Sequence, residues 1–97
     1  MNISTCIAKI TAKEEHSETV FSELTKIISP TRVEDGCLNY DMHTDNNNPS
    51  VFMFHENWES EQALDKHLES IHIKQCFEVI GDMLETVEIS RLTKVSH

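Results

Sequence analysis

The sequence predicts a single α+β domain with one antiparallel sheet and the element order β-α-β-β-α-β. Four short segments place apolar residues at the period of a strand, two longer segments place them at helical spacing, and turn-forming residues separate the segments. This order is the ferredoxin-like arrangement, in which the helices lie on one face of the sheet. A chain of 97 residues forms one domain, residues 1–97, and is too short for a second.

The first strand and the first helix are predicted from a change of period. Residues 3–11 carry apolar side chains on both faces of an extended segment. The apolar positions of the following segment have the helical spacing i, i+4, i+7 and i+8: Val20, Leu24, Ile27 and Ile28. We expect this helix to end near Ser29 and Pro30, because proline disfavours helical geometry in the residue before it.

The second and third strands form a predicted hairpin. Residues 37–45 alternate, with Leu38, Tyr40 and Met42 on one face. The stretch "DNNNPS", residues 45–50, is dense in turn formers and leads into a third strand over residues 51–58. One face of that third strand carries four large or acidic side chains: Phe52, Phe54, Glu56 and Trp58.

The last third of the chain is predicted to be two helical segments and a closing strand. Ser60 is a plausible N-cap for a helix to about Glu69, and a second segment over residues 71–80 stops at Gly81. Residues 83–95 alternate as a strand, with Val87 and Ile89 on one face. Since several strand positions are apolar on the face without helices, we expect a second copy to cover that face in a two-fold homodimer.

Composition excludes several classes of function. A formal net charge of −9, with the basic residues scattered singly, predicts no nucleic-acid binding. No apolar run reaches the ~20 residues of a membrane helix and the N-terminus lacks a signal-peptide pattern, so we expect a cytoplasmic protein with no membrane partner. The three cysteines are far apart, which predicts neither a disulfide framework nor a zinc cage.

Two histidines are candidates for a small-molecule site. His67 shares the apolar stripe of the predicted helix, whose other members are Leu64, Leu68 and Ile71. His72 begins the next helical segment, where the positive end of the helix dipole favours a neutral ring. If the face with Glu56 and Trp58 meets this helix, a carboxylate, an indole and two imidazoles converge in an apolar space suited to a small aromatic ligand.

A purely structural interpretation stays open at this point. The histidines could be partly buried and hydrogen-bonded to carbonyl groups, with Trp58 as ordinary core and Glu56 paired across the sheet. A metal site is not predicted, because His67 and His72 are five residues apart rather than at the i, i+4 spacing that places two ligands on one helical face. Motifs for phosphate, dinucleotide or serine-hydrolase chemistry are absent from the sequence.

Two stretches together resemble the antibiotic biosynthesis monooxygenase (ABM) family. They are "EDGCLNYDMH" and "VFMFHENWESEQALDKHLESIHIK", which span residues 34–74 and follow the pattern E-G-C-x-x-Y, E-x-W-E-S and H-L-x-S/T-x-H-x-K. Asp35 is inserted between Glu34 and Gly36, and Ile71 stands where the family usually has proline. The resemblance implies a dimeric α+β barrel.

For activity, the resemblance implies a monooxygenase that oxidises a small aromatic quinol or a polyketide-type substrate with O2 and without metal, flavin or other cofactor. It makes His67 or His72 the base that deprotonates the substrate, and Glu56 the group that orients an imidazole or a substrate hydroxyl. The residues expected to hold the substrate are Trp58 and Tyr40, with Phe52 and Phe54 as further walls.

Other branches of the family leave alternatives open. An isomerase of a phosphorylated hydroxyketone, a quorum-sensing signal, resembles this chain in "HIKQC" at residues 72–76. Haem degradation is not expected, because the iron-binding histidine of that branch aligns with Phe77. A non-catalytic dimeric module that binds an aromatic or hydroxyketone ligand is the third possibility.

Overall fold

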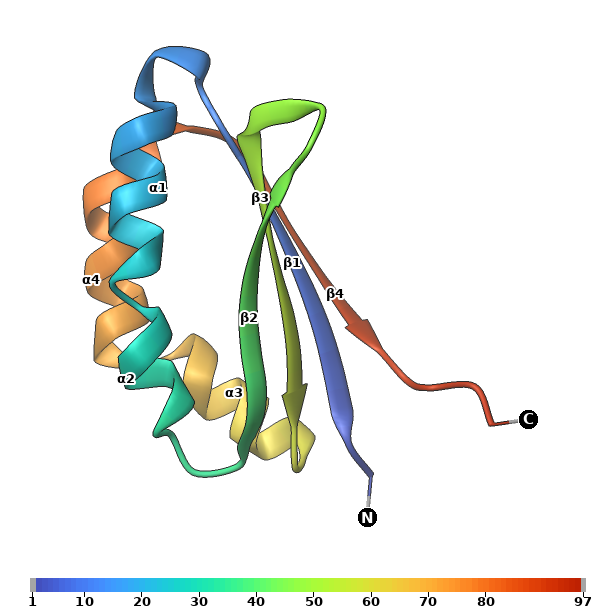
Figure 1. Ribbon diagram of the computed structural model, residues 1–97. Coiled ribbons are helices and arrows are strands. Elements are labelled where there is room, and N and C mark those ends of the chain that lie inside the picture. Colours follow the sequence, from blue (N-terminus) through green and yellow to red (C-terminus); the bar gives the residue numbers. More distant parts are fainter. Residues whose placement is uncertain (1, 97) are drawn as a thin grey trace.

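The computed structural model describes residues 2–96 and confirms the predicted fold. A four-stranded antiparallel sheet of order β2-β3-β1-β4 carries the helices on one face (Figure 1). In chain order the elements are β1 (Ser4–Ala12), the 3-10 helix η1 (Glu14–His16), α1 (Ser17–Thr25), α2 (Ile28–Arg32), β2 (Cys37–Asp45), β3 (Asn48–Trp58), α3 (Glu61–Leu68), α4 (Ile71–Ile80), the 3-10 helix η2 (Gly81–Met83) and β4 (Leu84–Leu92).

The register of the sheet brings three polar side chains to one level of the helix-covered face. Glu56 of β3 pairs with Cys6 of β1 on one side and with Tyr40 of β2 on the other. All three are buried, with exposed fractions of 3% or less. The sheet therefore places an acidic side chain in the middle of the core.

The core lies between this face and the helices. The largest side chains that are fully buried there include Trp58, Phe52, Phe54, Leu24, Leu64, Ile80 and His67. As predicted, alternate residues of β3 from Phe52 to Trp58 face the helices, and His67 belongs to the apolar stripe of α3. Ser60 caps α3, since its side chain accepts a hydrogen bond from the backbone N–H of Ala63 at 3.1 Å.

The predicted end of the first helix near Pro30 is wrong. Helix α1 ends at Thr25, and a separate short helix, α2, runs from Ile28 to Arg32 with Pro30 inside it. Pro30 is the third residue of α2, and the backbone N–H groups of a first helical turn have no partner within the helix. Proline removes no hydrogen bond at such a position, so it does not end the helix there.

The faces of two strands also differ from simple alternation. The β2–β3 pairing shifts register between Cys37 and Asn39, and Leu38 is 48% exposed rather than buried beside Tyr40. On β4, Val87 and Ile89 face the helix side but remain 43% and 47% exposed. They are exposed because β4 is an edge strand that the helices leave uncovered (Figure 1).

The helices within residues 2–96 were compared with the requirements for a membrane span. None of them combines the length and the hydropathy that crossing a bilayer requires.

Candidate functional site

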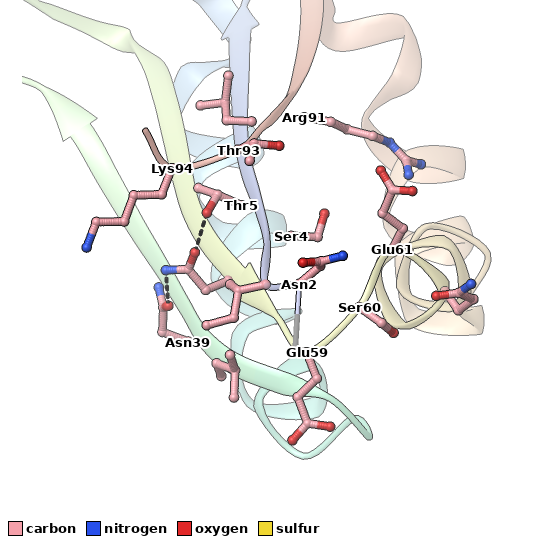
Figure 2. A pocket seen from close by; sticks show the side chains of 15 residues that line it. Asn2, Ser4, Thr5, Asn39, Glu59, Ser60, Glu61, Arg91, Thr93 and Lys94 are labelled. Atoms are coloured by element: carbon pink, nitrogen blue, oxygen red, sulfur yellow. Dashed lines mark hydrogen bonds between the residues drawn. The ribbon is translucent and has the colours of Figure 1, made fainter. Parts of the chain in front are cut away.

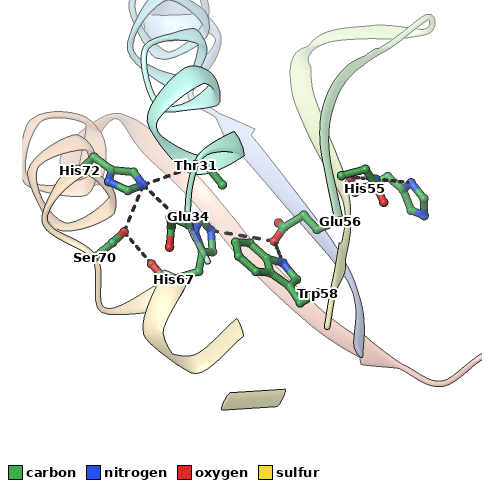
Figure 3. A network of polar contacts seen from close by, with 9 residues as sticks. Thr31, Glu34, His55, Glu56, Trp58, His67, Ser70 and His72 are labelled. Carbon is green, nitrogen blue, oxygen red and sulfur yellow. Dashed lines mark hydrogen bonds and ion pairs between the residues drawn. The ribbon is translucent and has the colours of Figure 1, made fainter. Parts of the chain in front are cut away.

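A cluster of polar side chains connects the loop before β2 to helices α3 and α4. Glu34, in the loop before β2, lies between His67 of α3 and His72 of α4 (Figure 3). Its Oε2 atom is 2.8 Å from Nδ1 of His67 and 2.9 Å from Nε2 of His72. Thr31 and Ser70 complete the cluster, with hydroxyl oxygens 3.1 Å and 3.3 Å from the same His72 nitrogen.

A tight contact between the loop and α3 fixes the position of Glu34. Gly36 has a φ of +85°, which glycine adopts without strain, and its carbonyl accepts a hydrogen bond from the Glu59 N–H at 2.8 Å. A Cβ atom at this position would lie 2.6 Å from the Cβ of Ala63 in the first turn of α3. The absence of a side chain at Gly36 thus lets the Glu34 loop pack against α3.

On its other side, His67 faces the acidic residue in the core. Nε2 of His67 is 3.9 Å from Oε1 of Glu56, and the indole N–H of Trp58 donates a hydrogen bond of 3.0 Å to the same oxygen. The imidazole also lies between aromatic rings, with centroid distances of 4.7 Å to Trp58 and 5.2 Å to Tyr40. Phe54 packs on Tyr40 at 4.8 Å and extends this aromatic wall.

Burial shifts the acid–base properties of these groups. It raises the pKa of Glu56 to about 7, an effect that the Trp58 hydrogen bond opposes and the negative charge of Glu34 reinforces. Burial likewise lowers the pKa of His67, although the hydrogen bond to Glu34 acts in the opposite direction. For Tyr40, burial raises the pKa, so the side chain stays a neutral phenol. Near neutral pH the core thus holds an unprotonated imidazole beside a carboxyl that can gain or lose a proton.

The convergence of His67 and His72 corrects one step of the sequence reasoning. The argument against a metal site rested on the spacing of two ligands on one helix, whereas His67 and His72 lie on separate helices, because α3 ends at Leu68 and α4 begins at Ile71. Glu34, His67 and His72 each offer a donor atom within 4.8 Å of the others, a set that could hold a metal ion. Ligands of a tetrahedral zinc ion lie roughly 3.3 Å apart. The separations of 2.8 Å and 2.9 Å from the Glu34 oxygen are instead those of charge-assisted hydrogen bonds.

The structure brings together most of the predicted site residues but not all. His67, His72, Glu56, Trp58, Tyr40 and Phe54 gather in one region. Phe52 instead packs against Phe21, 6.0 Å between centroids, and lines a separate cavity of about 470 Å³ beside α1. The strand position of His55 predicts that it lies on the opposite face of the sheet. The Asn39 side chain donates a hydrogen bond of 3.0 Å to the His55 backbone carbonyl.

Sequence reasoning missed the roles of Glu34, Thr31 and Ser70. For Glu34 a usable signal was its place two residues before Gly36 in the family-like stretch "EDGC". Thr31 is fully buried in α2, and the Ser70 hydroxyl donates to the carbonyl of His67 at 2.7 Å. Thr31 belongs to no recognisable motif, whereas Ser70 occupies the S/T position of the family-like pattern H-L-x-S/T-x-H-x-K, which was a usable signal.

A separate groove lies away from this cluster. It is a groove of about 1120 Å³ at the end of the sheet where β1 begins and β4 ends (Figure 2). Hydrogen bonds from Thr5 to Asn57, 2.6 Å, and from Asn57 to Asn39, 2.8 Å, cross the sheet along the groove. The space around Nε2 of His67 is closed, because Glu56, Trp58, His67 and Tyr40 are each at most 3% exposed.

Known proteins resemble this chain over most of its length. A family model described as "Antibiotic biosynthesis monooxygenase" matches residues 3–79. The crystal structure of PA3566 from Pseudomonas aeruginosa has a TM-score of 0.93 and 32% identity, covering 99% of this chain and 97% of that one. Rv0793 from Mycobacterium tuberculosis is 31% identical over 78 residues, which are 80% of this chain and 76% of that protein. The protein sll1783 from Synechocystis sp. (strain ATCC 27184 / PCC 6803 / Kazusa) is 26% identical over 87 residues, 90% of this chain, and the chain spans 59% of that relative's length.

Proposed function

Because the chain belongs to the antibiotic biosynthesis monooxygenase family, we propose that it is a monooxygenase that oxidises a small aromatic quinol or polyketide-type substrate without a cofactor. One observation carries the proposal. An imidazole whose pKa is lowered by burial faces a carboxyl whose pKa is about 7, and aromatic rings surround both. Such a space suits an electron-rich aromatic anion that reacts directly with O2.

The reaction uses His67 twice as a base. Nε2 of His67 takes a proton from the substrate, and the resulting anion transfers one electron to O2 before a C–O bond forms. The peroxide is protonated by the imidazolium, and the same nitrogen then removes a second proton as the O–O bond breaks. The departing hydroxide takes that proton and leaves as water, so the balance is RH2 + O2 → R=O + H2O.

The neighbouring side chains have distinct roles in this proposal. Protonated Glu56 donates a hydrogen bond to a substrate oxygen, and Trp58, Tyr40 and Phe54 hold the aromatic ring. Since these groups are buried, a substrate has to displace part of the packing around them before it reacts. Binding is therefore measured separately from turnover.

We also propose that the active form is a homodimer joined through the sheet face opposite the helices. On and beside that face, Ile3, Leu38 and Leu92 are 46–49% exposed, and they line the large groove. Apolar side chains at this exposure, on a sheet without helices on that side, support burial against a second copy.

Oxygen uptake with a panel of reduced naphthoquinones tests the activity. Uptake should exceed the autoxidation rate and fall about 10²-fold or more in His67→Ala, whereas His16→Ala, in η1 and outside both the site and the proposed dimer face, should retain it. Uptake no faster than autoxidation across the panel would refute the monooxygenase. An NMR time course with a phosphorylated hydroxyketone then identifies an isomerase, and binding of the quinols without turnover identifies a ligand-binding module.

A further inference from the structure

We infer that Glu34 is the positioning residue of this site: it holds His67 in the tautomer whose Nε2 is free to accept a proton, and it stabilises the imidazolium that then forms. The structural part of this inference stands on the geometry of the Glu34–His67–His72 cluster. The catalytic part rests on the proposed function, so the two parts are measured separately.

The tautomer follows from which atoms face each other. A carboxylate oxygen only accepts hydrogen bonds, so the 2.8 Å contact between Glu34 and Nδ1 of His67 requires the ring proton to be on Nδ1. The other nitrogen, Nε2, then carries the lone pair. It points away from Glu34 toward Glu56, 3.9 Å away, inside the aromatic walls. That lone pair is the base of the proposed reaction.

Glu34 is itself held from the side nearer to solvent. His72 contacts the same Oε2 atom at 2.9 Å, and its side chain is 21% exposed whereas that of His67 is 2% exposed. Thr31 of α2 and Ser70, the residue before α4, approach the same His72 nitrogen and restrain that ring (Figure 3). The carboxylate therefore sits between an inner histidine that faces the core and an outer one that anchors it.

The stoichiometry of the reaction explains why a fixed carboxylate matters. Both protons taken from the substrate end in the water product, so His67 has to keep each proton until an oxygen atom needs it. A buried imidazolium without a partner would lose its proton to any acceptor, because burial disfavours the charged form. The negative charge of Glu34, in direct contact with Nδ1, counteracts this loss.

Nitrogen-15 NMR of the labelled wild-type protein tests the structural part without any substrate. Long-range proton–nitrogen correlations, with His67 identified by its absence in His67→Gln, should show Nδ1 protonated and Nε2 unprotonated at pH 7.5. A ring protonated on Nε2, or on both nitrogens, would overturn the inference. This measurement uses the native chain, so it does not depend on the folding of a Glu34 variant.

Glu34→Gln tests the link to catalysis. The amide can donate to Nδ1, which moves the ring proton to Nε2 and removes the base; in serine proteases the equivalent exchange lowers kcat about 10⁴-fold for this reason. We expect kcat to fall about 10²–10⁴-fold with KM changed only a few-fold, and the His67 spectrum to switch tautomer. Glu69→Gln, an exposed glutamate two residues after His67, is the matched control and should change neither.

The outcomes separate the two proposals. If the tautomer switches in Glu34→Gln while no quinol is oxidised even by the wild type, the proposed function fails and the positioning role stands. If the wild type oxidises quinols and Glu34→Gln keeps the tautomer and the full rate, the positioning role fails and the function stands. Glu34→Asp, which keeps the charge on a shorter side chain, should retain the wild-type tautomer and recover part of the lost kcat.

Discussion

The buried carboxyl of Glu56 should make the stability of this protein decrease between about pH 4.5 and pH 7. In the unfolded chain the carboxyl ionises near its ordinary pKa of 4.5, whereas burial raises the folded value to about 7. Within that window the unfolded chain has released a proton that the folded chain still holds, so rising pH favours unfolding. This difference in pKa corresponds to a destabilisation of the folded state by roughly 3 kcal/mol, which is complete above pH 7 and absent well below pH 4.5.

Glu56→Gln isolates this contribution, since the amide has almost the same shape and can still accept the Trp58 hydrogen bond. We expect the free energy of unfolding of the variant minus that of the wild type to increase by about 3 kcal/mol from pH 4 to pH 8. The measurement is urea denaturation at several pH values and one fixed protein concentration, with Glu69→Gln as the exposed control. A difference that is constant over this range would refute the raised pKa, and one that decreases would reverse its sign.

Four further predictions follow from the same structure. The kcat of quinol oxidation should rise with pH as His67 loses its proton, with an apparent pKa below 6.5, and fall again near pH 7 as Glu56 ionises; Glu56→Gln should remove only the fall. Gly36→Ala should lower the free energy of unfolding by about 1–3 kcal/mol in chemical denaturation, because its Cβ would lie 2.6 Å from that of Ala63. Trp58→Phe removes the hydrogen-bond donor to Glu56, so the unfolding free energy should fall by about 1–3 kcal/mol in the same assay. Light scattering at micromolar concentration should give twice the 11.2 kDa mass of one chain, and a value near 11.2 kDa would contradict the homodimer.

The fold was largely predictable because its signals are local. The bounds predicted for α4 from helical spacing and the end signal at Gly81 match the observed ones. The bounds predicted for β2 from the alternation in residues 37–45 match as well. The errors occur where tertiary contacts override local preference. Pro30 lies in the first turn of a second helix, and the register shift beside Cys37 leaves Leu38 exposed rather than in the core.

The site was predictable only in part because its parts come from different elements. Periodicity placed His67 in the core stripe of α3 and Glu56 beside Trp58 on one strand face, and both placements are confirmed. Periodicity within one element says nothing about a loop 33 residues before His67. The contact of Glu34 with both histidines depends on the break between α3 and α4 and on the approach of the loop at Gly36.

The energetic cost of burying Glu56 and His67 together is the strongest physical argument that this pair has a function. A domain of this size has a total stability of roughly 5–15 kcal/mol, so a buried carboxyl that costs about 3 kcal/mol above pH 7 removes a large share of it. His67 adds a second buried titratable group less than 4 Å away, and burial lowers its pKa. An apolar pair of similar volume would fill the same space between Trp58 and Tyr40 without either cost. Structural packing alone therefore does not explain two ionisable groups at this place, whereas the proposed reaction uses both: His67 takes and returns protons, and Glu56 donates a hydrogen bond to the substrate.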